Sequence, residues 1–323
     1  MKKFVHAFAA YIMRGRSQAI LVTAAGAILS LLVFPFVFPL GQLSAACVAL
    51  VTLRRGAFEG ALIIVGATLI SGGLAAVSAS DMNMAMSFIL MYVLAMWGPV
   101  WIVSVILRYT RALDLALVTA SVLGIVVVVA LHVLIGDVTA WWAGILTKMF
   151  EPMLQNSNLS TEDANRLVGE MAGQMTGTLA AGFMLGVMTS LFLARWWQAM
   201  LYYPGGFGKE FRSLRLDRRV AIASVVIAVL SFVPVEKITD VSHDIFVVVI
   251  AAYMLHGLAV THSVVSAMGM HTAWLAVMYL MALFLPPVRV LIAAAGFADS
   301  WVNLRTRIGR AENHHDPGDP DRD

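Results

Sequence analysis

The chain has 323 residues, of which 60% are hydrophobic and 13% are charged. Soluble domains average about 25% charged and about 45–50% apolar residues, so a soluble core of this size would not hide so much apolar surface. The net charge is +3, and the basic residues lie between apolar blocks, which excludes a nucleic-acid-binding surface as their purpose. One cysteine, Cys47, excludes a disulfide framework. Composition therefore predicts an integral membrane protein whose main partner is the lipid bilayer.

Apolar blocks follow one another along the chain, near residues 18–38, 40–53, 56–78, 84–107, 112–135, 176–194, 219–235, 244–264 and 270–298. Most approach the length of about 20 residues that a spanning helix needs. Pro99 and the pair Pro286–Pro287 are able to break two of these blocks. The pattern predicts an all-α fold, a polytopic transmembrane helical bundle.

Basic residues between the blocks predict the topology, because cytoplasmic loops of membrane proteins are enriched in lysine and arginine. If every basic cluster is cytoplasmic, each interval between clusters must hold an even number of crossings. Only the last interval, from Arg219 to Arg305, holds three blocks, and Arg289 within it is costly in lipid. We therefore expect that one of these three blocks does not cross, or that the final one folds back at Pro286–Pro287. This gives eight crossings with both termini cytoplasmic, and nine crossings remain open.

The predicted domain organisation is one integral-membrane domain over residues 1–309, followed by a disordered cytoplasmic tail over 310–323. Residues 136–175 form an external helical segment in this topology. Ser160 and Asp163 have the spacing of a helix N-cap. This segment is either a helical cap or a lid over a cavity near the outer leaflet. The candidate cavity residues are aromatic and polar: Tyr92, Trp97, His132, Trp141 and Trp142.

Groups that support catalysis are scarce. The two histidines His256 and His262 point to different faces of a helix, so we expect hydrogen-bonded buried residues rather than a metal pair. We expect Glu59 to pair with a nearby arginine, Arg54, Arg55 or Arg111. No phosphate-binding loop, dinucleotide fingerprint or catalytic triad is recognisable. The sequence therefore predicts no enzyme, no catalytic residue, no metal site and no cofactor.

Residues 195–219 form the most distinctive loop, which we expect to lie at the cytoplasmic membrane interface. Its tryptophans and tyrosines suit lipid headgroups, and Pro204 begins a turn. Contact with anionic lipid and docking of a membrane or cytoplasmic protein partner both fit it. The residues predicted to make that contact are Pro204, Gly205, Gly206, Glu210, Phe211, Arg212, Leu214 and Arg215.

Two motifs carry a resemblance to a known family: WWQ-(x)5-PGGF-x-x-EFRSLRL, and GFADSWVNLRTRIGR from Gly296 to Arg310. The chain resembles the YybS-like family of uncharacterised bacterial membrane proteins along roughly its whole length. The resemblance implies a place in the bacterial cytoplasmic (inner) membrane and no established activity. Its signature positions mark membership and not a mechanism, and they include Phe207 and the C-terminal residues Gly296, Asp299 and Arg305.

A more distant similarity is to the substrate-binding membrane subunits of energy-coupling-factor transporters. It implies a small-molecule solute bound near the outer face, although those subunits have fewer helices and a stricter small-residue motif in the first helix. The first hypothesis is therefore transport-related solute binding. The alternative is a non-catalytic membrane scaffold that contacts cell-envelope or other partner proteins through residues 195–219 and through glycines spaced for helix packing, Gly169, Gly173 and Gly177.

Overall fold

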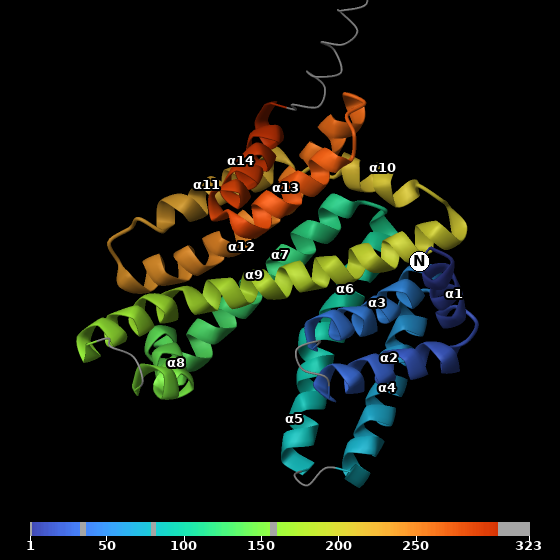
Figure 1. Ribbon diagram of the computed structural model, residues 1–323, viewed down its shortest axis with the longest axis horizontal. Coiled ribbons are helices and arrows are strands. Elements are labelled where there is room, and N and C mark those ends of the chain that lie inside the picture. The colour runs from blue at the N-terminus through green and yellow to red at the C-terminus, as the bar shows by residue number, and fades with distance from the viewer. Residues whose placement is uncertain (1, 33–36, 79–81, 156–159, 303–323) are drawn as a thin grey trace, which may run out of the picture. The chain divides into compact units, whose positions relative to one another are not determined.

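The computed structural model describes residues 2–32, 37–78, 82–155 and 160–302 (Figure 1). All regular secondary structure in these ranges is helical, without a strand, and this confirms the predicted all-α class. The signature residue Arg305 and the predicted tail 310–323 lie outside the described residues.

The chain divides into two compact units. Unit 1 comprises Met1–Val126 and Gly182–Lys209, and unit 2 comprises Val127–Ala181 and Glu210–Asp323. The predicted single domain over 1–309 stays a prediction.

Unit 1 contains the first helices of the chain (Figure 1) and the C-terminal part of α9. They are α1 (Lys2–Ile12), α2 (Arg16–Leu32), α3 (Val37–Arg55), α4 (Ala57–Ser78), α5 (Met82–Tyr92), the π-helical turn η1 (Val93–Trp97), α6 (Gly98–Thr110) and the start of α7 (Leu113–Ile135). Helix α3 packs against α2, α4 and α6. The carboxylate of Glu59 on α4 pairs with Arg16 on α2, 2.8 Å from its Nε, and not with Arg54, Arg55 or Arg111. This hydrogen bond raises the pKa of the Arg16 guanidinium.

Unit 2 contains the end of α7, the start of α9 and the C-terminal helices. Its remaining helices are α8 (Val138–Gln155), the second half of α10 (Gly206–Ser213), α11 (Arg218–Leu230), α12 (Glu236–Ala267), α13 (Ala273–Phe284) and α14 (Pro286–Val302). The closest helix contact is between α12 and α14. A Cβ atom on Gly257 would lie 1.8 Å from the Ile292 carbonyl oxygen, and one on Gly296 would lie 2.5 Å from the Tyr253 carbonyl oxygen. Only glycine allows these two backbones to approach so closely.

Five helices of the described chain are long and apolar enough to cross a membrane, or six if the bent pair α13–α14 is one span. The eight or nine crossings predicted from the sequence exceed these five or six candidate spans. Part of the difference arises because the blocks at 18–38 and 219–235 form helices of only 17 and 13 residues, and the block at 40–53, in α3, is also not among the candidate spans. The block at 270–298 bends by 120° where α14 begins at Pro286.

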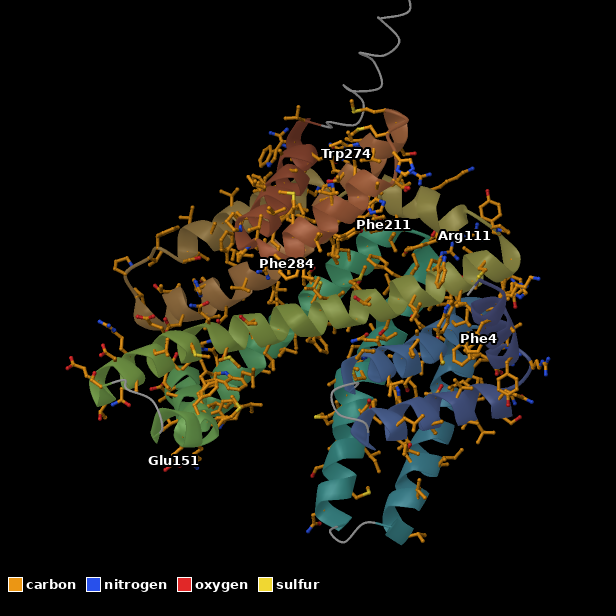
Figure 2. All side chains as sticks on the ribbon, viewed as in Figure 1. Phe4, Arg111, Glu151, Phe211, Trp274 and Phe284 are labelled. Carbon is orange, nitrogen blue, oxygen red and sulfur yellow. The ribbon has the colours of Figure 1, made fainter. Side chains whose placement is uncertain are left out.

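Large apolar side chains point outward on these helices, and Trp274 and Phe284, labelled in Figure 2, lie near the two ends of α13. They are 58% and 71% exposed. Exposed apolar surface on long apolar helices is the surface that lipid covers. The chain is therefore a multi-pass membrane protein.

Pro99 does not break its helix, because the turn before it changes register. The Gly98 N–H bonds to the Val93 carbonyl, five residues back, in the π-helical turn. A proline inside a regular helix clashes with the carbonyl four residues before it, and a π-turn relieves that clash. Residues Ile89–Thr110 consequently stay one candidate span.

Helix α9 (Thr161–Tyr202) runs for 42 residues without interruption. The Ser160 hydroxyl accepts the Asp163 N–H at 3.1 Å and bonds to the Asp163 carboxylate at 2.6 Å, which confirms the predicted N-cap. At 1.5 Å per residue the helix is about 63 Å long, roughly twice the hydrocarbon thickness of a bilayer. Its polar N-terminal part therefore extends beyond the apolar layer, and the expected boundary at 175 lies inside this helix.

Candidate functional site

A polar cavity lies inside unit 2, between α7, α8, α9 and α12. Its volume is about 260 Å³. The polar lining comprises three hydroxyls and four ionisable groups, which are Thr139, Thr176, Thr239, His132, Asp240, His243 and Asp244. The volume is just under the range of roughly 300–1,000 Å³ that is usual for small-molecule sites, so the cavity suits a small solute.

Asp244 holds three helices together at this cavity. Its Oδ2 atom lies 2.8 Å from Nε2 of His132 on α7, and its Oδ1 atom accepts the backbone N–H of Gly177 on α9 at 2.9 Å. The residue is 4% exposed. A Cβ on Gly177 would lie 3.0 Å from the Asp244 Cα, so glycine lets α9 approach close enough for this bond. The carboxylate is thus positioned before any ligand arrives.

The segment 136–175 forms one wall of the cavity. Val138 and Thr139 at the start of α8 line it, as do Ala172 and Gly173 on α9. The two helices pack through a small core of Leu146, Val168 and Ala172. Trp142 ties them together, because its Nε1 donates to the Thr176 Oγ1 at 3.0 Å.

The lining groups offer hydrogen bonds of both kinds and negative charge. Carboxylates accept hydrogen bonds and attract cations, whereas neutral imidazoles and hydroxyls donate and accept. Within the described ranges, no three histidine, cysteine, aspartate or glutamate side chains are grouped so that they could hold a metal ion. The arrangement can hold a small polar molecule that carries a positive charge.

The five predicted cavity residues are divided between the units. His132 lines the cavity of unit 2. Trp141 packs edge to face on Trp142 with ring centroids 4.6 Å apart. Tyr92 and Trp97 belong to the core of unit 1, where Tyr92 bonds to Ser30, and Trp97 Nε1 donates to the Ser44 hydroxyl at 3.0 Å.

Sequence reasoning missed the acidic half of the cavity. Asp240 and Asp244 are four residues apart, so they share one face of a helix. Asp244 is also the first residue of an apolar block, where a charge is expensive and usually functional. The four-residue spacing of Asp240 and Asp244 is the sequence feature that could have identified this site.

A second buried polar cluster lies at the crossing of α12 and α14. Nε2 of His256 lies 3.1 Å from Oδ2 of Asp299, and both side chains are fully buried. Arg215, which precedes α11, donates to the Asp299 carbonyl oxygen from Nε and Nη2 at 3.3 and 3.2 Å. Three signature positions, Arg215, Gly296 and Asp299, therefore meet in one structural cluster.

The predicted contact residues of the 195–219 loop differ in exposure. Pro204 and Gly205 are exposed, Gly206 and Leu214 are buried, and Glu210, Arg212 and Arg215 are half-buried. Phe211, labelled in Figure 2, packs edge to face on His262 with centroids 5.4 Å apart. His262 in turn bonds to the Tyr279 hydroxyl at 2.8 Å.

Comparisons of the chain with protein-family models, with curated proteins and with solved structures find no match. The fold and the site together define a multi-pass, all-helical membrane protein with a polar cavity inside one of its units.

Proposed function

We propose that this protein binds a small cationic solute in the unit 2 cavity, in a transport-related role in the bacterial inner membrane. One observation carries the proposal: a polar cavity bounded by the segment 136–175 and built around the part-buried His132–Asp244 pair. Ionisable groups inside membrane helices are rare because they are costly in lipid, and they commonly mark substrate pathways.

The charge of the lining supports a cation as the solute. Asp240 and Asp244 contribute two carboxylates. An ammonium group would bond to the Asp244 carboxylate, and the three threonine hydroxyls would bond to the rest of the solute.

The topology predicted from the basic clusters supports a position of this cavity at the outer face. Basic clusters on either side of 112–194 favour a cytoplasmic position for both ends of that stretch, and both termini are then cytoplasmic. The wall formed by α8 and the start of α9 lies outside the membrane in this arrangement. It is the arrangement implied by the distant similarity to energy-coupling-factor substrate-binding subunits.

Membership of the YybS-like family is part of the same proposal. Its support is the meeting of Arg215, Gly296 and Asp299 at the α12–α14 crossing. Residues that contact one another in the fold limit which side chains fit at each position. A sequence motif that contains these three residues is therefore consistent with one shared fold.

The test is a thermal-shift screen of the purified protein in detergent against small amines, diamines, amino acids and vitamins. A ligand at 100 times its Kd stabilises the folded state by about 2.7 kcal/mol. Asp240→Asn should weaken the stabilisation by a cationic hit, because Asp240 lines the cavity but is exposed and does not hold the fold. Glu162→Gln removes the same charge at the exposed start of α9 and is the matched control.

A hit whose affinity falls equally in both variants binds through general electrostatics and contradicts the proposal. The absence of stabilisation by every cationic compound also contradicts it.

The scaffold remains the alternative, favoured by the exposed turn at Tyr203, Pro204 and Gly205. Tyr203 is 65% exposed, so a photo-crosslinking residue there tests it better than one at the buried Leu214. Capture of one dominant protein from cells would support a scaffold, and capture of lipid alone would exclude it.

A further inference from the structure

An apolar groove of about 360 Å³ lies between α11, α12 and α14 in unit 2. It shares no lining residue with the polar cavity. Its walls are aliphatic and aromatic, and they include Val225, Ala228, Phe246, Ile250, Ala294 and Phe297. A groove of this composition selects a hydrocarbon chain and offers nothing to a polar solute.

A line of aromatic rings leads from the groove to a basic end. Tyr253 packs on Phe297 with centroids 5.3 Å apart, and Phe297 lies 6.1 Å from Trp301. The guanidinium of Arg218 stacks over the Trp301 ring at 4.9 Å. Tryptophan beside arginine is typical of the headgroup level of a membrane.

The groove and the basic end lie on the same helix. Helix α11 begins at Arg218, and its groove residues Ser224 and Ala228 lie six and ten residues further on, about 9 and about 15 Å along the helix axis. Arg218 and Arg219 lie at its N-terminus, where the helix dipole also favours an anion. The groove and the basic end are therefore separated as the acyl chain and the phosphate of one lipid are.

The charge at that end is complementary to a phosphate. Arg215, Arg218 and Arg219 lie within five residues, and Arg218 and Arg219 are exposed. Asp217 caps α11 by accepting the Arg219 N–H at 2.8 Å, and Asp299 is fully buried against His256. The two exposed arginines therefore outnumber the one exposed acid within residues 215–219.

We propose that an anionic phospholipid occupies this groove, with an acyl chain along the apolar lining and its phosphate beside Arg218 and Arg219. A free phosphate would use only the basic end, and a neutral lipid only the groove. Both features in one place favour a lipid with a negative headgroup.

The test compares retention of phosphatidylglycerol and phosphatidylcholine by native mass spectrometry, with the full chain released from nanodiscs that contain both lipids. The wild type should retain phosphatidylglycerol preferentially. Removing both arginines (R218Q with R219Q) should reduce that preference by about fivefold for each arginine. Replacing Arg14 and Lys209 by glutamine removes the same charge at exposed positions of unit 1 and should leave the preference intact.

A second pair of variants tests the groove itself. Ala228→Phe fills it, whereas Ala223→Phe adds the same ring to an exposed position of α11 that does not line it. The first should abolish retention of the lipid and the second should not.

Displacement of the bound lipid by millimolar inorganic phosphate would identify a simple anion site and overturn the proposal. Equal losses in each variant and its control would overturn it as well. So would a chain that binds no lipid but forms a dimer that Ala228→Phe dissociates.

Discussion

Gly257 allows the closest backbone contact in unit 2, and Gly257→Ala tests whether the α12–α14 crossing determines the stability of that unit. An alanine Cβ would lie 1.8 Å from the Ile292 carbonyl oxygen, whereas real Cβ atoms essentially never come within 3.0 Å of a neighbour. That oxygen belongs to the backbone and cannot rotate away, so the two helices must separate by at least the difference, about 1.2 Å.

The expected cost is about 1–3 kcal/mol, the usual range for overpacking a close contact. A further loss follows if the displacement of α14 lengthens the bond between His256 and Asp299, which joins the same two helices. The gain in helix propensity from glycine to alanine is about 1 kcal/mol and acts in the opposite direction. The variant should therefore unfold several degrees below the wild type.

The assay is intrinsic-fluorescence unfolding in one detergent at one scan rate, because irreversible unfolding makes an apparent Tm depend on that rate. Gly182→Ala is the matched control, since a Cβ there meets no atom within 4 Å. Gly296→Ala should be as harmful as Gly257→Ala. The double variant should lose less than the sum, because a Cβ on Gly296 would meet the Gly257 nitrogen at 2.6 Å. Equal Tm values for Gly257→Ala and Gly182→Ala would refute the close-contact argument.

Three further predictions concern polar contacts. Asp299→Asn should destabilise the protein by about 3–5 kcal/mol in chemical unfolding, because the carboxylate is fully buried beside His256; an unchanged unfolding midpoint would contradict this. Arg215→Gln should cost clearly less, because its side chain is 38% exposed, and the same measurement ranks the two variants. Ser160→Ala should cost about 1 kcal/mol at the start of α9 and increase hydrogen exchange locally at residues 161–166, with exchange at residues 190–200 unchanged.

The class of the fold follows from composition and periodicity, while the number of crossings does not. Apolar blocks near 20 residues predict helices in lipid, and this physics is local to each block. Whether a block is one helix or two depends on turns such as the bend between α13 and α14. The N-cap at Ser160 was predictable because it joins residues three apart, and the break at Pro286 follows from the missing N–H of proline.

The candidate site was only half predictable, because its contacts join residues far apart in the sequence. His132 is identifiable as a polar residue in an apolar block, but its partner Asp244 is 112 residues away. The same holds for Glu59, whose partner Arg16 is 43 residues away and not in the adjacent arginine cluster. A hydrophobic pattern predicts which face of a helix is buried. It does not predict which other helix packs against that face.

Two histidine–aspartate pairs of unit 2 involve α12, and they are built differently. Asp244 and His256 are twelve residues apart, about 18 Å along the helix. At His256 the helix is held by the glycine contacts with α14 and by a fully buried pair. At Asp244 it is held by one partly exposed pair and one backbone N–H, beside an open cavity. Fewer buried contacts must break to open the structure around Asp244 than around His256. Solute entry should therefore move the N-terminal end of α12, while its crossing with α14 stays fixed.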